Sequence, residues 1–291
     1  MEIRNRKAAK TTALILVCLC ATVAALTAAP RTTESATAKR KFTLKFITYN
    51  VCALPDMFIF DRNLVMPTSK RLEYIGERLK KYDVAGLQEA FQFKRTILEK
   101  ELGEYYVGHG ADIANIKNVG SGVYTFSRYS VTRIYYERWN PSSGADSFSH
   151  KGLVEITTEI APGLSLDVYN LHGQAGGENS EEIRSINYDQ LNNSIKMLSR
   201  GTGHPIVMLG DYNCEFGEPA CDHLLKITGV KSVIPKQEGV DHIFYDENNS
   251  NWKITVLDYK KAFPYDGDGM VNGKYVSDHE AFEATLQFEE K

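Results

Sequence analysis

The stretch PIVMLGDYNCEF, residues 205–216, runs a short apolar segment into the polar end Gly-Asp-Tyr-Asn. Residues 206–209 are all apolar, which is typical of a buried strand. Asp211 and Asn213 are two positions apart, so in an extended chain they lie on one side and could hold one polar group together. The alternative is a plain turn, because Asp and Asn bond their own backbone. Taken alone, the stretch favours the turn.

The segments around this stretch alternate between helix and strand patterns from residue 40 onward. Helical spacing of apolar residues occurs over 69–82, 91–102, 180–201 and 218–228. Strand patterns occur over 42–51, 83–90, 122–139, 151–173, 205–211, 239–246, 252–263 and 276–288. Helices interleave with strands in the first half, and antiparallel-looking strands dominate later. We therefore predict an α/β fold, a two-sheet β-sandwich of mixed strands flanked by helices in four layers.

Two of the expected helices carry an apolar stripe that predicts their buried face. In the helix over 69–82 the stripe is formed by Leu72, Ile75 and Leu79. In the helix over 180–201 it is formed by Ile183, Ile186, Leu191, Ile195 and Leu198, with Gly201 as the expected stop.

The first thirty residues have the layout of a secretory signal. A basic start, MEIRNRKAAK, precedes a run of apolar and small residues that ends at Ala29. We predict a signal peptide over 1–29, a polar tail over 30–40 and one domain over 41–291, so the mature protein is expected outside the cell. The alternative is that the apolar run remains as a membrane anchor.

The charge balance argues against a tight nucleic-acid binder. The chain has 34 basic and 37 acidic residues, a formal charge of −3. Without residues 1–30, which hold four bases and one acid, 30 bases and 36 acids remain and the charge becomes −6. No block rich in Lys and Arg is present, so we expect no stable nucleic-acid complex. We expect a monomer.

Three cysteines, Cys52, Cys214 and Cys221, follow the expected cleavage site. In an oxidising compartment, Cys214 and Cys221 could close a short loop directly behind the Asp211–Asn213 pair. Their spacing does not establish a disulfide, so the free and the bonded forms both stay open. Cys52 is expected to be buried beside the first strand.

Polar and ionisable residues recur at the ends of the expected strands. They are Asn50, Glu89, His172, Asp211, Asn213, Asp241, Asp278 and His279. Each has a purely structural explanation: a turn former, an acid at a helix start, or a histidine satisfied within the core. If two sheets share one open end, however, all of these side chains converge there, and that is the functional interpretation.

Seven short motifs run along the chain in the order ITYNV, LQEA, SGVYTFSRYSV, YNLHGQ, MLGDYN, VDHIF and SDHEA. In this order and spacing they resemble the DNase I-like endonuclease/exonuclease/phosphatase superfamily, over essentially residues 42–289. The resemblance implies a sandwich of two mixed β-sheets flanked by helices, and hydrolysis of a phosphoester at a metal-activated site. His242 departs from the family pattern, which usually has a tyrosine or similar there, so we expect it to pack away from Asp241.

The resemblance implies a Mg²⁺ site, although another divalent ion could serve. Glu89 matches the direct metal ligand, with Asn50 supporting it. Asp278 matches either a second ligand or a support for His279. Oxygen ligands suit Mg²⁺, which keeps several of its waters and uses few protein carboxylates.

The same resemblance implies catalytic roles for five residues. His279 matches the general base, since imidazole titrates near working pH, and Asp241 would orient it and stabilise its charged form. Asp211 and Asn213 would position the attacking water and a phosphate oxygen. His172 would donate to the phosphate or protonate the leaving oxygen. On this interpretation, the strand over 205–211 ends in Asp-Tyr-Asn because the pair faces the phosphate.

A finer resemblance concerns the substrate. The stretch IYYERWNPSSGADSFSHKGLVEI, residues 134–156, is similar to a loop of the neutral sphingomyelinases, with Asp146 five positions before Lys151 and Gly152. In that family the Asp and the Lys make the site competent, and the lysine lies near the substrate phosphate as a point charge. The alternative is a flexible loop with a solvated lysine.

The leading hypothesis is therefore a secreted Mg²⁺-dependent phosphodiesterase that cleaves sphingomyelin to ceramide and phosphocholine. A secreted nuclease of the same fold is the second, and it predicts salt-sensitive duplex binding. A non-catalytic binding module is the third, and the joint presence of Glu89, Asp211, Asn213 and His279 argues against it.

A sphingomyelinase must reach a phospholipid or sphingolipid at a membrane surface. Met57, Phe58, Ile59 and Phe60 form an apolar run that could insert shallowly into lipid, as could Trp252 in a later hairpin. The apolar run could equally fold back over the core.

Overall fold

The structure is a computed structural model that describes residues 39–54, 64, 67–110, 114–115, 118–234 and 239–291. The expected signal peptide, most of the polar tail and the apolar run over residues 57–60 lie outside the described residues. Among the helices of the described ranges, none has the length and apolar character needed to cross a membrane.

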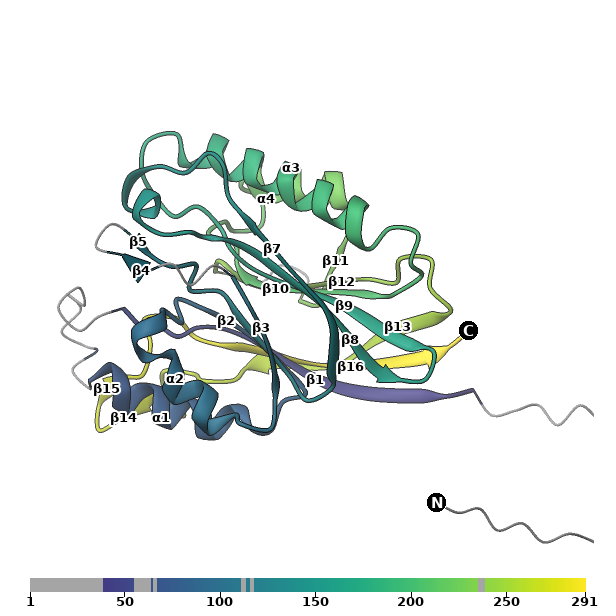
Figure 1. Cartoon of the computed structure of the whole chain (residues 1–291), viewed down its shortest axis with the longest axis horizontal. Coiled ribbons are helices and arrows are strands. Elements are labelled where there is room, and N and C mark those ends of the chain that lie inside the picture. The colour runs from purple at the N-terminus through teal and green to yellow at the C-terminus, as the bar shows by residue number, and fades with distance from the viewer. Residues whose placement is uncertain (1–38, 55–63, 65–66, 111–113, 116–117, 235–238) are drawn as a thin grey trace, which may run out of the picture. The chain divides into compact units, whose positions relative to one another are not determined.

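Two six-stranded sheets pack against each other in the domain that begins at Lys39 (Figure 1). The first sheet has the order β13 (Trp252–Lys261), β16 (Phe282–Glu290), β1 (Lys41–Asn50), β2 (Val84–Gln88), β6 (Tyr124–Ser127) and β3 (Tyr106–His109). The second has the order β11 (Lys231–Ser232), β12 (Asp241–Asp246), β10 (Ile206–Asp211), β9 (Leu164–His172), β8 (Gly152–Ala161) and β7 (Ser130–Arg138).

Helices cover the outer face of each sheet. The first sheet carries α1 (Thr68–Leu79) and α2 (Gln92–Glu101), and the second carries α3 (Ser180–Leu198) and α4 (Pro219–Thr228) (Figure 1). Two small hairpins and one 3₁₀ helix complete the domain: β4 (Ala114–Asn115) with β5 (Asn118–Val119), β14 (Met270–Val271) with β15 (Lys274–Tyr275), and Gly144–Phe148. The predicted four-layer α/β sandwich is confirmed.

Strand β1 shows why its sequence forms the centre of the first sheet. Leu44 and Phe46 point into the apolar core between the two sheets, whereas Ile47 and Tyr49 pack in the core beneath α1 and α2. Successive side chains of a strand point to opposite faces. Because both faces are covered in the second half of β1, that half is buried at every position, including the polar residues Thr48 and Asn50.

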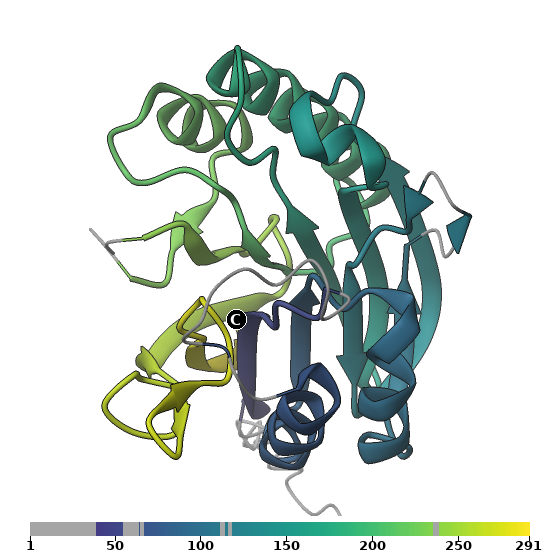
Figure 2. The same cartoon turned by 90° about the vertical axis from the view of Figure 1, so that its left-hand side faces the viewer.

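The sheet registers bring the ends of four strands together at one end of the sandwich. β1 pairs in parallel with β2 and places Asn50 opposite Gln88, next to Glu89. β10 pairs in parallel with β9 and antiparallel with β12, so Asp211 is the register partner of both His172 and Asp241. Figure 2 faces this end of the molecule.

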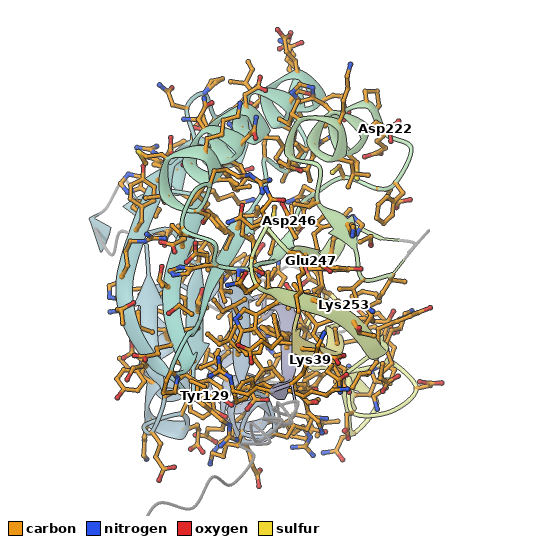
Figure 3. The ribbon with its side chains drawn as sticks, turned by 90° about the vertical axis from the view of Figure 1, so that its right-hand side faces the viewer. Lys39, Tyr129, Asp222, Asp246, Glu247 and Lys253 are labelled. Carbon is orange, nitrogen blue, oxygen red and sulfur yellow. The ribbon has the colours of Figure 1, made fainter. Side chains whose placement is uncertain are left out.

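The other end of the sandwich is held by surface charges. β12 starts at Asp241 and runs away from the site to Asp246, which lies beside Glu247 and Lys253 on the far face (Figure 3). Arg200 Nη1 pairs with Asp246 Oδ2 at 2.5 Å, and Lys291 Nζ pairs with Glu247 Oε2 at 2.9 Å. These ion pairs lie where β12 ends, away from Asp241.

Helix α3 differs in two ways from its predicted pattern. Ile186 is 37% exposed, because the buried face continues through Asn187 and Tyr188 rather than through Ile186. The Tyr188 hydroxyl donates to the carbonyl of Tyr212, which ties the helix to the end of β10. The helix also ends at Leu198, three residues before Gly201. In α1, by contrast, the predicted stripe is fully buried, as confirmed for Leu72, Ile75 and Leu79.

Of the two alternatives for Trp252, insertion into lipid or burial over the core, the structure shows burial. Its side chain is only 3% exposed and packs edge-on against Phe42, with the ring centroids 5.6 Å apart. The indole Nε1 donates to the carbonyl of Gly163 at 3.1 Å. The residue closes the end of the core between the sheets, where burial of its apolar ring is more favourable than exposure.

Two further details of the fold concern the strands predicted over 122–139 and the short strands. β6 and β7 follow each other in sequence but lie in different sheets, so the chain crosses from one layer to the other at Ser127–Ser130. β3, β4, β5, β11, β14 and β15 were not predicted, because each has at most four residues and carries too few alternations to stand out.

The three cysteines are free thiols, all of them buried. The side chains of Cys214 and Cys221 share a hydrogen bond, so the open question about this pair is answered in favour of contact without a disulfide. His242 is buried, and its Nε2 lies 2.8 Å from the carbonyl oxygen of Cys214. Its ring packs with Tyr212 and Phe216, which confirms the packing role expected for it.

Candidate active site

Asn50 joins the two sheets at the end where the motifs converge. Its Nδ2 donates to Glu89 Oε1 at 3.3 Å and to Asp211 Oδ2 at 3.0 Å, and its Oδ1 accepts the backbone N–H of Cys52 at 3.1 Å. The amide therefore turns its nitrogen, not its oxygen, toward the two acids. In this geometry Asn50 orients Glu89 and Asp211 rather than offering a metal an oxygen.

Asp211 lies at the centre of the polar network. Its Oδ2 lies 3.4 Å from His172 Nε2 and 3.8 Å from His279 Nε2, and its Oδ1 accepts the backbone N–H of Asn213 at 3.0 Å. Burial, together with the nearby negative charge of Asp241, raises the pKa of Asp211 to about 6. The carboxylate is thus held close to two imidazoles in a site that disfavours its charge.

His279 and Asp241 form the tightest pair in the network, with Nδ1 and Oδ2 2.7 Å apart. Burial alone would lower the pKa of His279, but the charge and hydrogen bond of Asp241 and the charges of Asp211 and Asp278 raise it to about 10. Because Nδ1 is bonded to Asp241, Nε2 is the nitrogen that faces the network. This pairing matches the orienting role predicted for Asp241.

His172 differs from His279 in its charge state. Burial first, and then the positive charges of Lys151 and His279, hold the pKa of His172 well below its usual value, so its imidazole is neutral. Its buried Nδ1 has no hydrogen-bond partner among the described residues. Its backbone carbonyl accepts the indole N–H of Trp139 at 2.7 Å. A neutral imidazole can donate a hydrogen bond to a phosphate but has no extra proton to give to a leaving oxygen.

Lys151 and Asp146 form a buried ion pair beside this network. Their Nζ and Oδ1 atoms are 2.8 Å apart, and their side chains are only 8% and 10% exposed. Asp146 Oδ2 also accepts the backbone N–H of Ala175 at 2.7 Å, which ties the 3₁₀ helix Gly144–Phe148 to the loop after β9. The positive charge of Lys151 partly offsets the rise in the pKa of Glu89 and Asp211 that burial causes, so the lysine faces the same crevice.

Three non-glycine residues at the site have left-handed backbone conformations. Glu89 has φ 53°, Asn213 has φ 52° and Cys52 has φ 45°. Glu89 directly follows β2, and Cys52 and Asn213 lie two positions after β1 and β10. Such conformations cost of order 1–3 kcal/mol and persist where the surroundings fix them. At Glu89 and Asn213 they turn the side chain back toward the strand ends, where Asn213 Nδ2 donates to the carbonyl of Gly173 at 3.2 Å.

Arg71 is a site residue that the sequence analysis did not identify. It is fully buried in α1, and its guanidinium donates to the carbonyls of Val51 at 3.1 Å, Cys52 at 2.8 Å and Val276 at 2.8 Å. It thus holds together the loop after Asn50 and the loop before His279. Its signal was a charged residue four positions before Ile75, on the stripe that α1 buries.

Ser277 makes a second link between these loops. Its Oγ donates to the carbonyl of Asn50 at 2.6 Å and accepts the backbone N–H of His279 at 3.2 Å. Its hydroxyl also lies 3.4 Å from Asp278 Oδ1. Asp278 itself is exposed at the rim, so the structure leaves its carboxylate accessible to a ligand while Ser277 positions its neighbour.

The donor set fits a divalent cation. The four carboxylates of Glu89, Asp211, Asp241 and Asp278 act on one another across the crevice, against the charges of Lys151 and His279. Burial is the main cause that raises the pKa of Glu89, and the negative charges of Asp278 and Asp211 add to it. Asp211, Asp241 and His279 also offer ligand atoms within 4.8 Å of one another. Carboxylate oxygens around excess negative charge are what Mg²⁺ requires.

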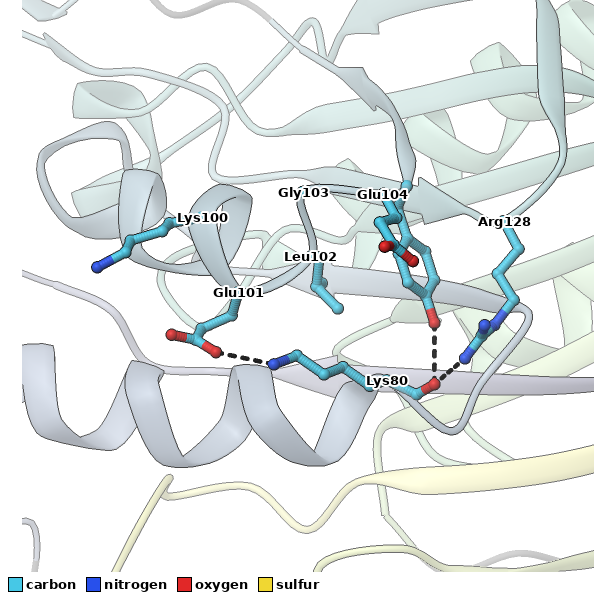
Figure 4. Close-up of a pocket in the computed structure, with 8 residues that line it drawn as sticks. Lys80, Lys100, Glu101, Leu102, Gly103, Glu104 and Arg128 are labelled. Atoms are coloured by element: carbon cyan, nitrogen blue, oxygen red, sulfur yellow. Dashed lines mark hydrogen bonds and ion pairs between the residues drawn. The ribbon is translucent and has the colours of Figure 1, made fainter.

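A separate cavity of about 400 Å³ lies at the opposite end of the first sheet (Figure 4). Lys80 Nζ pairs there with Glu101 Oε2 at 3.0 Å, and the carbonyl of Lys80 accepts the hydroxyl of Tyr105 at 3.1 Å and a guanidinium N–H of Arg128. Arg128 lies outside the network. It adjoins the start of β2, whereas Glu89 follows the end of that strand. None of the residues assigned to the network lines this cavity, and we assign the chemistry to the site at Glu89.

The network contains most of the predicted site residues. Hydrogen bonds or ion-pair distances connect Asn50, Glu89, His172, Asp211, Asn213, Asp241 and His279. Lys151 and Asp146 lie beside it, and Asp278 lies at its rim. The convergence of these side chains on one crevice, which the functional interpretation required, is therefore present in the structure.

Comparison with known proteins agrees with this geometry. Residues 47–279 match the Endonuclease/Exonuclease/phosphatase family. A sphingomyelinase of Mycobacterium bovis is 24% identical over 203 residues, which make up 67% of this chain and 39% of that protein. The chain thus spans about two-fifths of the length of that curated relative.

Solved structures show the same fold at low sequence identity. Beta toxin from Staphylococcus aureus with bound magnesium ions has a TM-score of 0.64, 19% identity and coverage of 86% of this chain and 100% of that chain. Sphingomyelinase C from Streptomyces griseocarneus has a TM-score of 0.64 and 17% identity, covering 84% and 99%. TDP2 from D. rerio, complexed with a single-strand DNA product, has a TM-score of 0.63 and 16% identity, covering 84% and 98%. With the family match over most of the domain, these findings show that the chain belongs to the Endonuclease/Exonuclease/phosphatase family.

Proposed function

We propose that the protein is a secreted Mg²⁺-dependent phosphodiesterase that hydrolyses sphingomyelin to ceramide and phosphocholine. The family and the site support the coarser statement, a metal-dependent hydrolase of the phosphodiesterase type. The finer proposal rests on one observation, the buried pair of Lys151 and Asp146 beside the network. Asp146 compensates the cost of burying the lysine charge, and the effect of Lys151 on the pKa of Glu89 and Asp211 supports a role for its charge beside a substrate phosphate.

Each residue of the site has its own role in the proposed hydrolysis of the phosphodiester. Lys151 Nζ and the neutral His172 stabilise the negative phosphate oxygens as hydrogen-bond donors. His279 takes a proton from the attacking water at Nε2 as the new P–O bond forms and the P–O bond to ceramide breaks, while Asp241 holds Nδ1 and stabilises the imidazolium that forms. The ceramide oxygen takes up a proton from solvent water. Asp211 and Asn213 orient the water and the phosphate. Asn50 keeps Glu89 and Asp211 in place.

Glu89 and the exposed Asp278 would hold the metal, with Asn50 supporting Glu89. When bound, Mg²⁺ would neutralise phosphate oxygens and add the positive charge that lowers the pKa of His279 toward the working range. Asp278 is one of the carboxylates that raise the pKa of His279 to about 10, and it is also one of the two proposed metal ligands. The proposed base is therefore expected to act only in the metal-loaded protein.

The direct test is release of phosphocholine from sphingomyelin vesicles. We expect release with Mg²⁺, loss of release with a chelator, and recovery when Mg²⁺ is added in excess, because no residue of the site replaces the cation. The same preparations are incubated with supercoiled plasmid. Nicking of the plasmid without release of phosphocholine would overturn the proposal in favour of a nuclease.

A nuclease of the same fold is the second candidate, favoured by the likeness to TDP2 in complex with a DNA product. It requires basic surface to neutralise a nucleic-acid backbone. The chain after residue 30 has a formal charge of −6. We therefore expect no stable nucleic-acid complex, and filter binding at low salt would check this.

Replacing Lys151 with methionine is expected to lower kcat/KM for sphingomyelin by roughly 10²-fold, the size found for removing one donor to a developing anion. The change keeps the length of the side chain but removes its charge. Lys226→Met, at an exposed position of α4, is the matched control and should change kcat/KM less than about twofold. Equal activity of the two variants would show that Lys151 is structural.

The location and partners of the protein are part of the proposal. The layout of residues 1–29 supports secretion, and a phosphodiesterase for sphingomyelin would act as a monomer at a lipid surface. N-terminal sequencing of material recovered from the medium is expected to begin near Pro30. An intact Met1 would instead favour the membrane-anchored form.

A further inference from the structure

A cavity of about 340 Å³ borders the catalytic pair on its outer side. His279, Asp241 and Asp278 form one wall of this cavity, so it opens directly onto the network described above. The other walls come from the loop after β10, from the residues just before β12, and from the end of β13, the start of β16 and the loops beside them. The residues are Glu215, Gly239, Val240, Lys261, Tyr265, Glu280 and Phe282. A substrate held at His279 would place one of its ester substituents here.

The charges around this cavity are predominantly negative. Asp241 is paired with His279 at 2.7 Å, and Glu280 Oε2 is paired with Lys261 Nζ at 2.5 Å. Among the described residues, the carboxylates of Glu215 and Asp278 have no such basic partner. Asp278 faces the metal site, which leaves the exposed Glu215 as the acid that the cavity can offer to a cation.

Tyr265 gives the cavity a fixed aromatic wall. Its backbone N–H donates to Glu280 Oε1 at 3.2 Å, and its ring packs on Tyr275 with the centroids 4.3 Å apart. Burial, followed by the charges of Asp278 and Glu280, raises the pKa of Tyr265, so its hydroxyl stays protonated. The ring is therefore neutral and electron-rich on its face. Aromatic faces beside carboxylates are the usual setting for recognition of alkylated ammonium groups.

We propose that this cavity is the headgroup subsite of the active site and binds the positively charged ammonium group of a phosphodiester substrate, with Glu215 and Tyr265 as specificity-determining residues. The inference rests on the proposed function, which it deepens by naming the residues that recognise the headgroup. A choline or ethanolamine headgroup carries its cation two carbons from the phosphoester oxygen, so a subsite that adjoins the catalytic histidine is in reach. A neutral inositol or glycerol headgroup gains nothing from Glu215.

The kinetic test compares a cationic with an uncharged headgroup on the same lipid. Glu215→Gln is expected to lower kcat/KM for sphingomyelin roughly tenfold, the size of a partly desolvated cation contact, and to leave ceramide phosphoinositol within about twofold. Tyr265→Leu is expected to act in the same direction, mainly through KM. Glu104→Gln, an exposed glutamate that lines the cavity in Figure 4, is the matched control and should change neither value. An equal loss on both lipids, or no loss on either, would overturn the subsite.

A binding measurement separates this proposal from the proposed function. Choline chloride is titrated into the Mg²⁺-loaded protein and followed by ligand-observed NMR, with glycerol as the uncharged probe. We expect choline to bind the wild-type chain and Glu104→Gln, and to bind Glu215→Gln at least fivefold more weakly. Choline binding without sphingomyelin turnover would support the subsite and contradict the proposed function. Sphingomyelin turnover, together with choline binding that Glu215→Gln does not weaken, would support the function and contradict the subsite.

Discussion

Replacing His279 with alanine is expected to lower kcat for phosphocholine release by at least ~10²-fold, because general-base transfer contributes ~10²–10⁴-fold to such reactions. The structure places its Nε2 in the network and its Nδ1 2.7 Å from Asp241. The measurement is kcat on sphingomyelin vesicles at saturating Mg²⁺, with circular dichroism to confirm that the variant is folded.

Asp241 acts through His279, so a double variant tests whether the two residues work as one unit. Asp241→Asn alone is expected to lower kcat, but Asp241→Asn combined with His279→Ala should fall no further than His279→Ala by itself. His223→Ala is the matched control, since His223 Nε2 pairs with Asp189 on the surface at 2.9 Å, outside the site. Turnover that His279→Ala leaves unchanged would revive the interpretation as a non-catalytic binding module.

Arg71→Met is expected to have the largest effect on folding. The change removes the donors to the carbonyls of Val51, Cys52 and Val276 and leaves these oxygens buried without partners. An unsatisfied buried group costs about 1–3 kcal/mol, so we expect the free energy of unfolding to fall by roughly 3–5 kcal/mol. Urea denaturation followed by tryptophan fluorescence measures this loss.

Two variants make the Arg71 result specific. Arg78→Met lies on the same helix, where Arg78 Nε is 3.8 Å from Asp268 Oδ1 and partly exposed, and should cost less than about 1 kcal/mol. Arg71→Lys keeps the charge but not the forked guanidinium, so it should recover only part of the stability. If Arg71→Met and Arg78→Met unfold at the same urea concentration, the hydrogen bonds by which Arg71 joins the two loops do not contribute to stability.

The hydrogen bonds of Arg71 also connect the stability of the fold to the geometry of the site. Arg71 contacts the loop that follows Asn50 and the loop that precedes Ser277 and His279. A loss of this contact is therefore expected to lower kcat even under conditions where Arg71→Met remains folded. The sign of that effect follows from geometry, since catalytic contacts tolerate little displacement.

The sequence was a good guide where local pattern decides the structure. The apolar spacing of Leu72, Ile75 and Leu79 predicted the buried face of α1, and the β-prone run through Phe46 and Tyr49 predicted β1. The seven motifs predicted polar residues at strand ends and the resemblance to the family, which the match over residues 47–279 confirms. These features depend on neighbours in sequence, so they could be predicted from a single sequence.

The sequence failed where exposure depends on what packs from elsewhere. Trp252 reads as a free aromatic in a hairpin, but Phe42 and the carbonyl of Gly163 bury it. Ile186 reads as part of a stripe, but the face of α3 that meets the second sheet continues through Tyr188. Arg71 reads as a surface charge within a helix, although it satisfies three carbonyls in the interior.

The amino-acid sequence by itself determined the order of strands and helices, the polar residues at strand ends and the expectation of a phosphoester site. Only the tertiary structure decided that Asn50 bonds Asp211 across 161 positions, and that His279 meets Asp241 across 38. Sheet registers and the packing of one sheet on the other set these contacts, and neither is encoded in a local pattern. For the same reason, the cavity beside Glu215 and Tyr265 exists only in the folded chain.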